Sequence, residues 1–150
     1  MAVSNRREDV LVTYSLGSCI AVVLYDKAAC VGGMVHYMLP ESAMDPEKAR
    51  TNPAMFADTG VPALFRAAYA LGAQKRSLRV TVAGGARILD DAGLFNIGKR
   101  NYLTLRNLFY RNNVLTAAEH VGGSDNRTVR LEMATGRVFL KTPDEGEREL

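Results

Sequence analysis

The apolar positions of this chain recur with a period of two in several short segments, which predicts a protein built largely from β-strands. In the first segment Val10, Val12 and Tyr14 alternate with other side chains, and β-branched residues dominate. Residues 20–25 are instead continuously apolar, so we expect this strand to be buried on both faces. The predicted strands cover residues 8–14, 20–25, 31–38, 78–83, 114–119, 127–133 and 136–141.

Two further segments carry apolar residues at the spacing of a helix. The first has the apolar face Leu64, Ala67, Ala68 and Leu71, and the second, over residues 98–111, has the stripe Tyr102, Leu105 and Phe109. We expect the first helix to start near residues 59–60, because Thr59 suits the N-cap and Pro62 is tolerated only in the first turn. Gly72 then ends this helix.

The order of these elements predicts an α+β fold. Strands and helices mix without a regular β-α-β alternation, and the chain ends in strands, which favours an α+β sandwich over a doubly wound parallel sheet. The polar residues 41–53 contain two prolines and are predicted to form a loop, and the acidic residues 143–150 a frayed tail. A length of 150 residues suits a single domain over residues 1–150.

Composition and charge exclude several classes of protein. Hydrophobic residues make up 47% and charged residues 23% of the chain, the usual balance of a globular domain. A net charge of +3, few aromatic residues and no basic stripe argue against a nucleic-acid partner. The charged N-terminus and the lack of a window of about 20 apolar residues argue against a signal peptide and against membrane insertion. We therefore expect a cytoplasmic protein with two reduced cysteines.

The residues that offer sulfur or imidazole chemistry are Cys19, Cys30, His36 and His120. A metal site normally needs three or four ligands at short spacings, and no such pattern is present, so we expect neither a metal nor a cofactor. The glycine-containing pairs 84–85 and 97–98 lack a phosphate-binding pattern and are predicted to be structural turns near the active site. We expect Arg100 and Asn101 to order a neighbouring loop.

Cys19 has the setting of a nucleophile, since it follows a Gly-Ser turn and begins the buried strand, where unpaired backbone N–H groups can form an oxyanion hole. A thiol of ordinary pKa needs an adjacent base. His36 lies seventeen residues later, and two neighbouring strands can bring the side chains together if both face the same way. Thr13, six residues before Cys19, carries a hydroxyl that can orient the imidazole, which completes a Cys-His-Thr relay.

Each of these residues also has an ordinary structural interpretation. A cysteine among apolar residues is more often an inert buried side chain. A single histidine on a strand is more often a hydrogen-bonded core or surface residue, and threonine is a good strand former. Cys30 stands near a turn without a base in view, which favours packing. Composition and spacing alone therefore leave catalysis as the minority hypothesis.

Several motifs change that balance. The segments VTYSLGSCIAVVLYD at 12–26 and VGGMVHYMLP at 31–40 resemble the opening of the CheD family of chemoreceptor glutamine deamidases. The resemblance continues in the expected order with AGGAR at 83–87, NIGKRN at 96–101, HVGGSDNR at 120–127 and GRVFLK at 136–141. It therefore covers nearly the whole chain, and its most specific parts are the GSC and the downstream HYMLP.

The resemblance implies a role for each candidate residue. Cys19 would be the nucleophile, His36 the general base and Thr13 the third member, with the backbone at Gly17 and Ser18 as oxyanion-hole and pocket candidates. The implied fold is α+β, a single-domain layered sandwich of mixed β-sheet with flanking helices, of the cysteine-hydrolase type. The implied function is a protein-glutamine deamidase that acts on the cytoplasmic helices of chemoreceptors in chemotaxis and releases ammonia.

Two alternatives stay open. The family also binds a CheC-type response-regulator phosphatase, so the chain could be an adaptor with little or no catalysis of its own; a hydrolase that acts on another amide is the second. Departures from the family pattern are Tyr14-Ser15 in place of Leu-Gly and His120 in place of an acidic residue. Neither departure touches the three candidate catalytic residues, but the first could alter the rim of the pocket.

Overall fold

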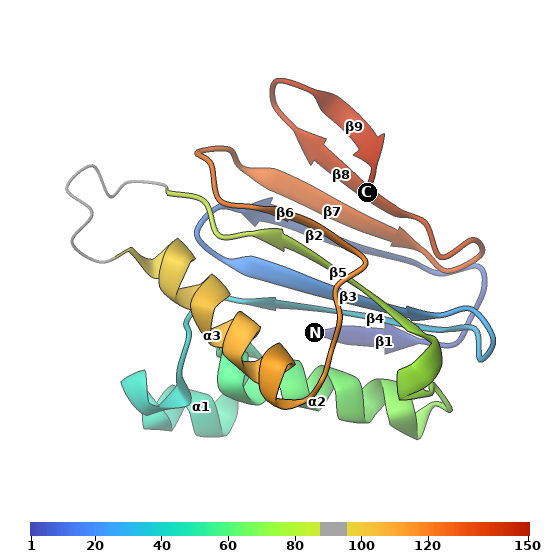
Figure 1. Cartoon of the computed structure of the whole chain (residues 1–150), viewed down its shortest axis with the longest axis horizontal. Helices are drawn as coiled ribbons and strands as arrows, with labels where there is room; N and C mark the ends of the chain where they lie inside the picture. Colours follow the sequence, from blue (N-terminus) through green and yellow to red (C-terminus); the bar gives the residue numbers. More distant parts are fainter. Residues whose placement is uncertain (88–95) are drawn as a thin grey trace.

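The computed structural model describes residues 1–87 and 96–150, which form two stacked β-sheets with helices on one side (Figure 1). The strands of this part of the chain are β1 (Ala2–Ser4), β2 (Val10–Leu16), β3 (Ile20–Asp26), β4 (Val31–Tyr37), β5 (Leu78–Gly84), β6 (Ala118–Val121), β7 (Arg127–Glu132), β8 (Val138–Thr142) and β9 (Gly146–Glu149). Its α-helices are α1 (Pro46–Thr51), α2 (Ala57–Ala70) and α3 (Ile97–Arg111).

The layers follow from the pairing of these strands. The five-stranded sheet has the order β1-β4-β3-β5-β6, and β5 and β6 are its parallel pair. The four-stranded sheet has the order β2-β7-β8-β9 and is antiparallel. Helices α2 and α3 cover one face of the five-stranded sheet, and the four-stranded sheet covers the other (Figure 1). The predicted α+β fold is confirmed, with two sheets and not one.

Strand β3 lies at the centre of the five-stranded sheet, and all seven of its residues are buried. Ile20 and Val22 pack with the apolar cluster beneath the helices. Ala21 and Val23 point the other way, into the apolar cluster between the two sheets. The prediction of burial on both faces is confirmed, and it holds in an antiparallel setting because each face has its own covering layer.

Strand β2 was predicted at residues 8–14 and lies at Val10–Leu16. The shift arises because the segment before it forms a turn, in which the Ser4 hydroxyl donates to the Asp9 carboxylate at 2.6 Å. The alternating residues Val10, Val12 and Tyr14 occupy the exposed face of the strand. Leu11 and Thr13 face the other sheet, so Thr13 is directed toward the space between the two sheets.

The strand predicted at 114–119 was wrong in its bounds, since β6 covers Ala118–Val121. Val114 follows α3 and is held by its C-terminal turn, because its backbone N–H donates to the carbonyl of Phe109 at 2.9 Å. Pairing with β5 begins where the Ala117 N–H donates to the carbonyl of Val80. These tertiary partners, rather than β-propensity, set the start of the strand.

Helix α2 begins at Ala57, two to three residues earlier than predicted, and Thr59 is not its N-cap. The Thr59 hydroxyl donates to the carbonyl of Pro53 at 2.6 Å. The first helical N–H, that of Ala57, is satisfied by the carbonyl of Leu39 at 2.9 Å, so no side-chain cap is required. Pro62 therefore lies inside the helix and beyond its first turn.

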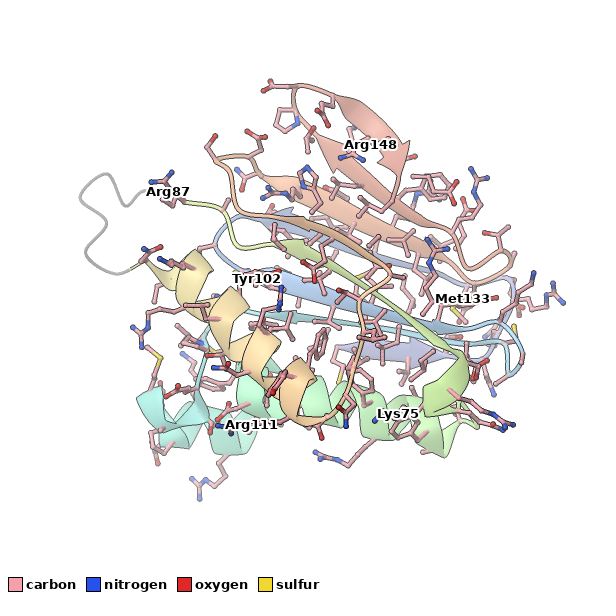
Figure 2. The ribbon with its side chains drawn as sticks, viewed as in Figure 1. Lys75, Arg87, Tyr102, Arg111, Met133 and Arg148 are labelled. Atoms are coloured by element: carbon pink, nitrogen blue, oxygen red, sulfur yellow. The ribbon has the colours of Figure 1, made fainter. Side chains whose placement is uncertain are left out.

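The apolar stripes of the two long helices are confirmed in part. Leu64 and Ala68 are buried as predicted, whereas Leu71 is 39% exposed because it follows the last helical residue. Gly72 ends the helix with a φ of +100°, the left-handed conformation that favours glycine. On α3 the predicted stripe packs against the helix-side cluster, and the Tyr102 hydroxyl reaches Glu119 on β6 at 2.5 Å (Figure 2).

The segment predicted as a loop at 41–53 contains helix α1 between two short 3-10 turns. The Asp45 carboxylate accepts from the backbone N–H of Lys48 at 3.0 Å and caps this helix, and Pro46 takes its first position. The prolines that suggested a loop therefore mark the starts of helical turns.

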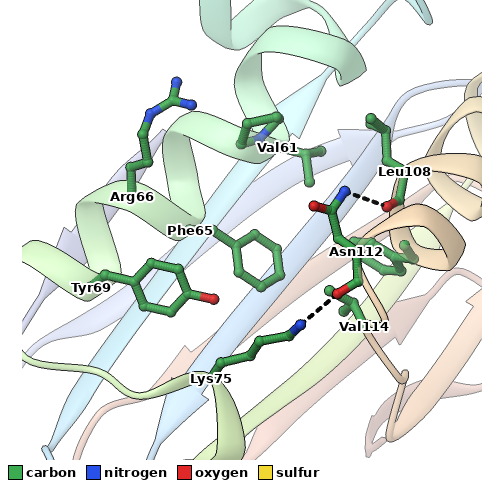
Figure 3. Close-up of a pocket in the computed structure, with 10 residues that line it drawn as sticks. Val61, Phe65, Arg66, Tyr69, Lys75, Leu108, Asn112 and Val114 are labelled. Atoms are coloured by element: carbon green, nitrogen blue, oxygen red, sulfur yellow. Dashed lines mark hydrogen bonds between the residues drawn. The ribbon is translucent and has the colours of Figure 1, made fainter.

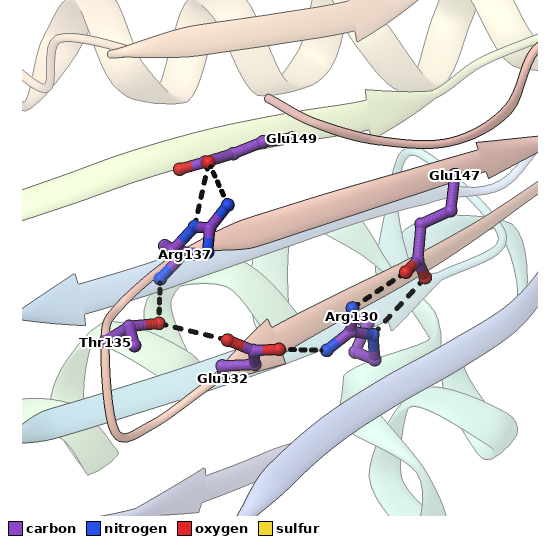
Figure 4. Close-up of polar contacts among 6 residues, drawn as sticks. All are labelled: Arg130, Glu132, Thr135, Arg137, Glu147 and Glu149. Atoms are coloured by element: carbon purple, nitrogen blue, oxygen red, sulfur yellow. Dashed lines mark hydrogen bonds and ion pairs between the residues drawn. The ribbon is translucent and has the colours of Figure 1, made fainter.

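The tail predicted to be frayed at 143–150 instead includes β9, which pairs with β8. Ion pairs on the outer face of the sheet hold it, Arg130 with Glu147 and Arg137 with Glu149, both at 2.8 Å (Figure 4). Both guanidinium groups also lie over the ring of Phe139. Charge in the tail therefore pairs across strands, and the prediction failed because it treated that charge as a sign of solvation.

Candidate active site

Two of the three predicted catalytic residues are in direct contact at the edge of the space between the sheets. The hydroxyl oxygen Oγ1 of Thr13, on β2, lies 2.8 Å from Nδ1 of His36, on β4. Both side chains are half-buried. Each sheet contributes one residue, so the contact depends on how the two sheets are stacked.

The cysteine reaches the same region through the register of β3 and β4. Ala21 is the direct partner of His36, and Cys19 precedes it by two positions, so both face the inter-sheet layer. Cys19 is therefore the diagonal neighbour of His36, a relation that in an antiparallel pair spans about 7–8 Å between backbones and less between side chains. The condition that both side chains face the same way is met.

Burial sets the protonation of this pair. Burial raises the pKa of the Cys19 thiol, and the thiol's own backbone N–H opposes that shift. Burial lowers the pKa of His36. The resting state at neutral pH is thus a thiol beside a neutral imidazole. Because Nδ1 faces the Thr13 hydroxyl, a proton on Nδ1 can be donated to Oγ1, which leaves Nε2 with a lone pair to act as a base.

The turn from Gly17 to Cys19 is held by its carbonyl groups. The Gly17 carbonyl accepts from the N–H of Ala86, and the Cys19 carbonyl from the N–H of Gly85, both at 2.8 Å. The Ser18 carbonyl accepts from the side-chain amide of Asn101 at 3.0 Å. Within residues 1–87 and 96–150, the N–H groups of Ser18 and Cys19 donate to no backbone carbonyl. The Cys19 N–H instead approaches its own thiol, whose pKa it lowers.

The glycine pair at 84–85 was predicted to be a turn, but Gly84 is the last residue of β5, and both glycines have positive φ beside the Cys19 turn. Gly84 has a φ of +118°, and a Cβ on it would overlap the Cys19 carbonyl oxygen. Residues 97–98 differ from the prediction, because they form the first turn of α3. Gly98 approaches the carbonyls of Gly85 and Ala86 more closely than any side chain would allow. The glycines thus let α3 and β5 pack against the turn at 17–19 that carries Cys19.

The remaining candidates have other contacts. Arg100 approaches the sulfur of Met44 at 4.0 Å. His120 lies on β6, and its Nδ1 accepts from Nε of the buried Arg127 at 2.8 Å. Burial lowers the pKa of His120, which suits this acceptor role. His120 therefore serves the 120–127 turn and does not join the Cys19 site.

A hollow of about 270 Å³ lies between α2 and α3, away from Cys19 (Figure 3). Its lining is mainly apolar, with Phe65, Leu108 and Val114 beside the Lys75 side chain. It is on the helix side of the five-stranded sheet, the face opposite to Cys19. Neither cysteine nor histidine lines it.

The described part of the chain holds neither a cluster of metal ligands nor a membrane-spanning helix. Between residues 1–87 and 96–150, no three His, Cys, Asp or Glu side chains gather closely enough to hold a metal ion. None of the helices described is both long and apolar enough to span a bilayer.

The chain is similar to a group of named proteins. A family profile described as "CheD chemotactic sensory transduction" matches residues 38–142. "Probable chemoreceptor glutamine deamidase CheD 1" of Syntrophus aciditrophicus is 57% identical over 148 residues, which is 99% of this chain and 92% of that relative. The corresponding proteins of Solibacter usitatus and Anaeromyxobacter dehalogenans are 50% and 46% identical and cover 93% and 97% of this chain, or 82% and 91% of their own lengths.

The matched profile begins after Thr13, Cys19 and His36, but the full-length relatives extend the similarity over the segment that carries all three. The order of the motifs and the extent of the identity agree. The chain belongs to the CheD family.

Proposed function

We propose that this chain is a cytoplasmic chemoreceptor glutamine deamidase, a hydrolase that converts glutamine side chains on the cytoplasmic helices of receptors to glutamate. Cys19 is the nucleophile, His36 the general base and Thr13 the residue that orients the base. The α+β sandwich is, in this proposal, of the cysteine-hydrolase type. Support comes from the names of relatives that are 46–57% identical.

One observation carries the assignment of residues: the 2.8 Å contact between Thr13 and His36, on the face of β4 that Cys19 shares. The hydroxyl holds Nδ1, and the register of β3 and β4 puts Cys19 on the same face of the sheet as His36. The contact also joins the two sheets, which supports a site between them.

Acylation begins when Nε2 of His36 takes the proton of the Cys19 thiol. The thiolate attacks the amide carbon of the substrate glutamine, and the carbonyl electrons move to its oxygen. In this proposal the N–H groups of Ser18 and Cys19, on the turn that carries the thiol, stabilise this oxyanion. The carbon–nitrogen bond then breaks, the imidazolium returns its proton, ammonia leaves and a thioester remains.

Deacylation repeats the proton transfers with water. His36 takes a proton from a water molecule, whose oxygen attacks the thioester carbon. The carbon–sulfur bond breaks, Cys19 leaves as thiolate and regains a proton, and the product is a glutamate side chain. The exchange adds a negative charge to the receptor helix and creates a carboxylate that can be methylated.

Ammonia release tests this proposal. Purified wild-type protein, Cys19→Ala and Cys30→Ala are incubated with a chemoreceptor cytoplasmic domain, and ammonia is measured over time. We expect release with wild type and with Cys30→Ala, because Cys30 lies in a turn outside the site, and none with Cys19→Ala. Equal release from Cys19→Ala would assign the activity elsewhere. No release from any protein, with binding to a CheC-type phosphatase intact, would favour the adaptor.

A further inference from the structure

Asn101 is a fully buried amide at the start of α3, on the helix side of the nucleophile turn. Its Nδ2 donates two hydrogen bonds, to the carbonyl of Ser18 at 3.0 Å and to the carbonyl of Met38 at 2.9 Å. Its own backbone carbonyl accepts from the hydroxyl of Tyr37 at 3.0 Å. The orientation of the amide is fixed, since the reverse would set its oxygen against two carbonyl oxygens.

These two bonds join the segments that carry the reacting groups. Ser18 directly precedes the nucleophile, and Met38 stands two residues after His36 on the same chain segment. Met38 is also the position that faces Cys19 when the register of β3 and β4 is extended by one residue beyond Ile20 and Tyr37. One side chain therefore fixes the nucleophile turn to the strand that carries the base.

The bond to Ser18 also sets the direction of the next N–H group. In a planar trans peptide the carbonyl of one residue and the N–H of the next point in opposite directions. With the Ser18 carbonyl turned toward Asn101 on the helix side, the Cys19 N–H points to the inter-sheet side, where the Cys19 side chain lies. The Gly17 carbonyl accepts from the N–H of Ala86, so by the same geometry the Ser18 N–H points away from Ala86.

We propose, building on the deamidase function above, that Asn101 is a positioning residue for the reaction. Through Ser18 it directs the Cys19 N–H at the developing oxyanion, and its bond to Met38 holds the amide in the orientation that this requires. A role in packing alone explains the residue less well, because Oδ1 of Asn101 is buried and accepts no hydrogen bond within the described part of the chain.

The test separates oxyanion stabilisation from thiol reactivity. In a Cys30→Ala background Cys19 is the single thiol, and its alkylation by iodoacetamide requires a thiolate but no oxyanion hole. We compare Asn101→Ala with Asn107→Ala, which removes an exposed asparagine from the same helix. For each variant we measure kcat and KM for receptor deamidation, the alkylation rate of Cys19 and the folded fraction by circular dichroism.

We expect Asn101→Ala to lower kcat by about 10²-fold with KM changed less than about threefold, as for the loss of an oxyanion donor. Alkylation should stay within about twofold of wild type. Asn107→Ala should match wild type in all three. Parallel loss of kcat and alkylation, or no loss of kcat, would overturn the positioning role.

A shape-matched variant covers the case in which Asn101→Ala does not fold. Asn101→Asp keeps the volume, and its protonated carboxyl donates one bond where the amide donates two, so kcat should fall and should fall further as the carboxyl ionises. If neither variant folds while Asn107→Ala does, Asn101 serves the fold and the proposal is overturned. An inactive wild type would instead overturn the proposed function itself.

Discussion

The third member of the proposed relay is a threonine, and this residue type fits the place that it occupies. Thr13 and His36 are half-buried between two sheets, where an unpaired or imperfectly solvated carboxylate would be costly. A neutral hydroxyl orients the imidazole without adding charge. It also leaves burial as the main influence on His36, whose pKa is lowered. The base is therefore neutral and ready at the pH of the cell.

Removal of that hydroxyl tests its role. Thr13→Val keeps the shape of the side chain but cannot hydrogen-bond to Nδ1 of His36. We expect kcat for deamidation to fall by about 10-fold or more, because a misoriented base forfeits part of the roughly 10²–10⁴-fold that general-base catalysis supplies. Thr13→Ser retains the hydroxyl and should stay close to wild type. Equal losses in both variants would point to packing.

The pH dependence of the rate reports on His36. Its lowered pKa means that the imidazole stays neutral down to a lower pH than an ordinary histidine does. As pH falls through the folded pKa the base is protonated and the rate is lost. The acid limb of kcat/KM should thus have its midpoint below about 6.5. A midpoint above that value, measured by initial rates at constant ionic strength, would contradict this assignment.

At the scale of elements, the turn at 17–19 that carries Cys19 depends on the end of β5. Gly84→Ala would force a Cβ against the Cys19 carbonyl and strain a φ of +118°. Gly72→Ala provides the matched control, because its φ of +100° is equally unfavourable but no atom lies near its Cβ. We expect both variants to lose stability and only Gly84→Ala to lose deamidase activity per folded molecule, measured by kcat and thermal unfolding. Full activity in Gly84→Ala would show that the turn tolerates displacement.

The carboxylate of Asp26 ties the turn after β3 to the start of β5. It accepts from the N–H groups of Ala28 and Gln74 at 2.9 and 2.8 Å and from the Ser77 hydroxyl at 2.5 Å. Burial works against the charged form, but these bonds outweigh it and lower the pKa of Asp26. Its contribution to stability is therefore present above the unfolded pKa and lost as pH falls through the folded pKa.

Replacement by asparagine should remove that contribution. We expect Asp26→Asn to lower the free energy of unfolding by about 1.5–3 kcal/mol at pH 7, the range for hydrogen bonds to charged groups. The loss should shrink as the wild type is itself titrated in acid. Denaturant unfolding at several pH values checks this, with the exposed Asp144→Asn as the control. A loss that does not change with pH would contradict the account.

Elements were predictable where their own side chains decide the structure. The continuous run of β3 and the stripe of α3 each gave nearly correct bounds, because burial of those side chains is what forms the element. The start of α2 and of β6 was misplaced, since the carbonyls of Leu39 and Val80 fix those ends from far away in the sequence. Strand β9 was missed because its glutamates form ion pairs with Arg130 on β7 and with Arg137 just before β8, which the sequence pattern does not show.

At the scale of the molecule, the site depends on the stacking of the two sheets, which the sequence pattern did not reveal. Thr13 and His36 belong to different sheets. The sequence offered Thr13 as a hydroxyl that orients the imidazole, but it did not indicate that the two residues lie in separate sheets. The register of β3 with β4 then brings Cys19 to the same face. Asn101 was expected to order a neighbouring loop, and its amide bonds to the carbonyls of Ser18 and Met38. Its burial inside α3 was not predicted, because a single buried amide leaves no periodic signal.

The central claim is that Cys19 converts receptor glutamines to glutamates. The most direct measurement is peptide mass spectrometry of a chemoreceptor cytoplasmic domain after incubation with wild type, Cys19→Ala or Cys30→Ala. The account predicts the mass increase of an amide-to-acid exchange at defined glutamines with wild type and Cys30→Ala, and an unchanged receptor with Cys19→Ala. The same increase at the same glutamines with Cys19→Ala, or no increase with the wild type on cognate receptors, would contradict it.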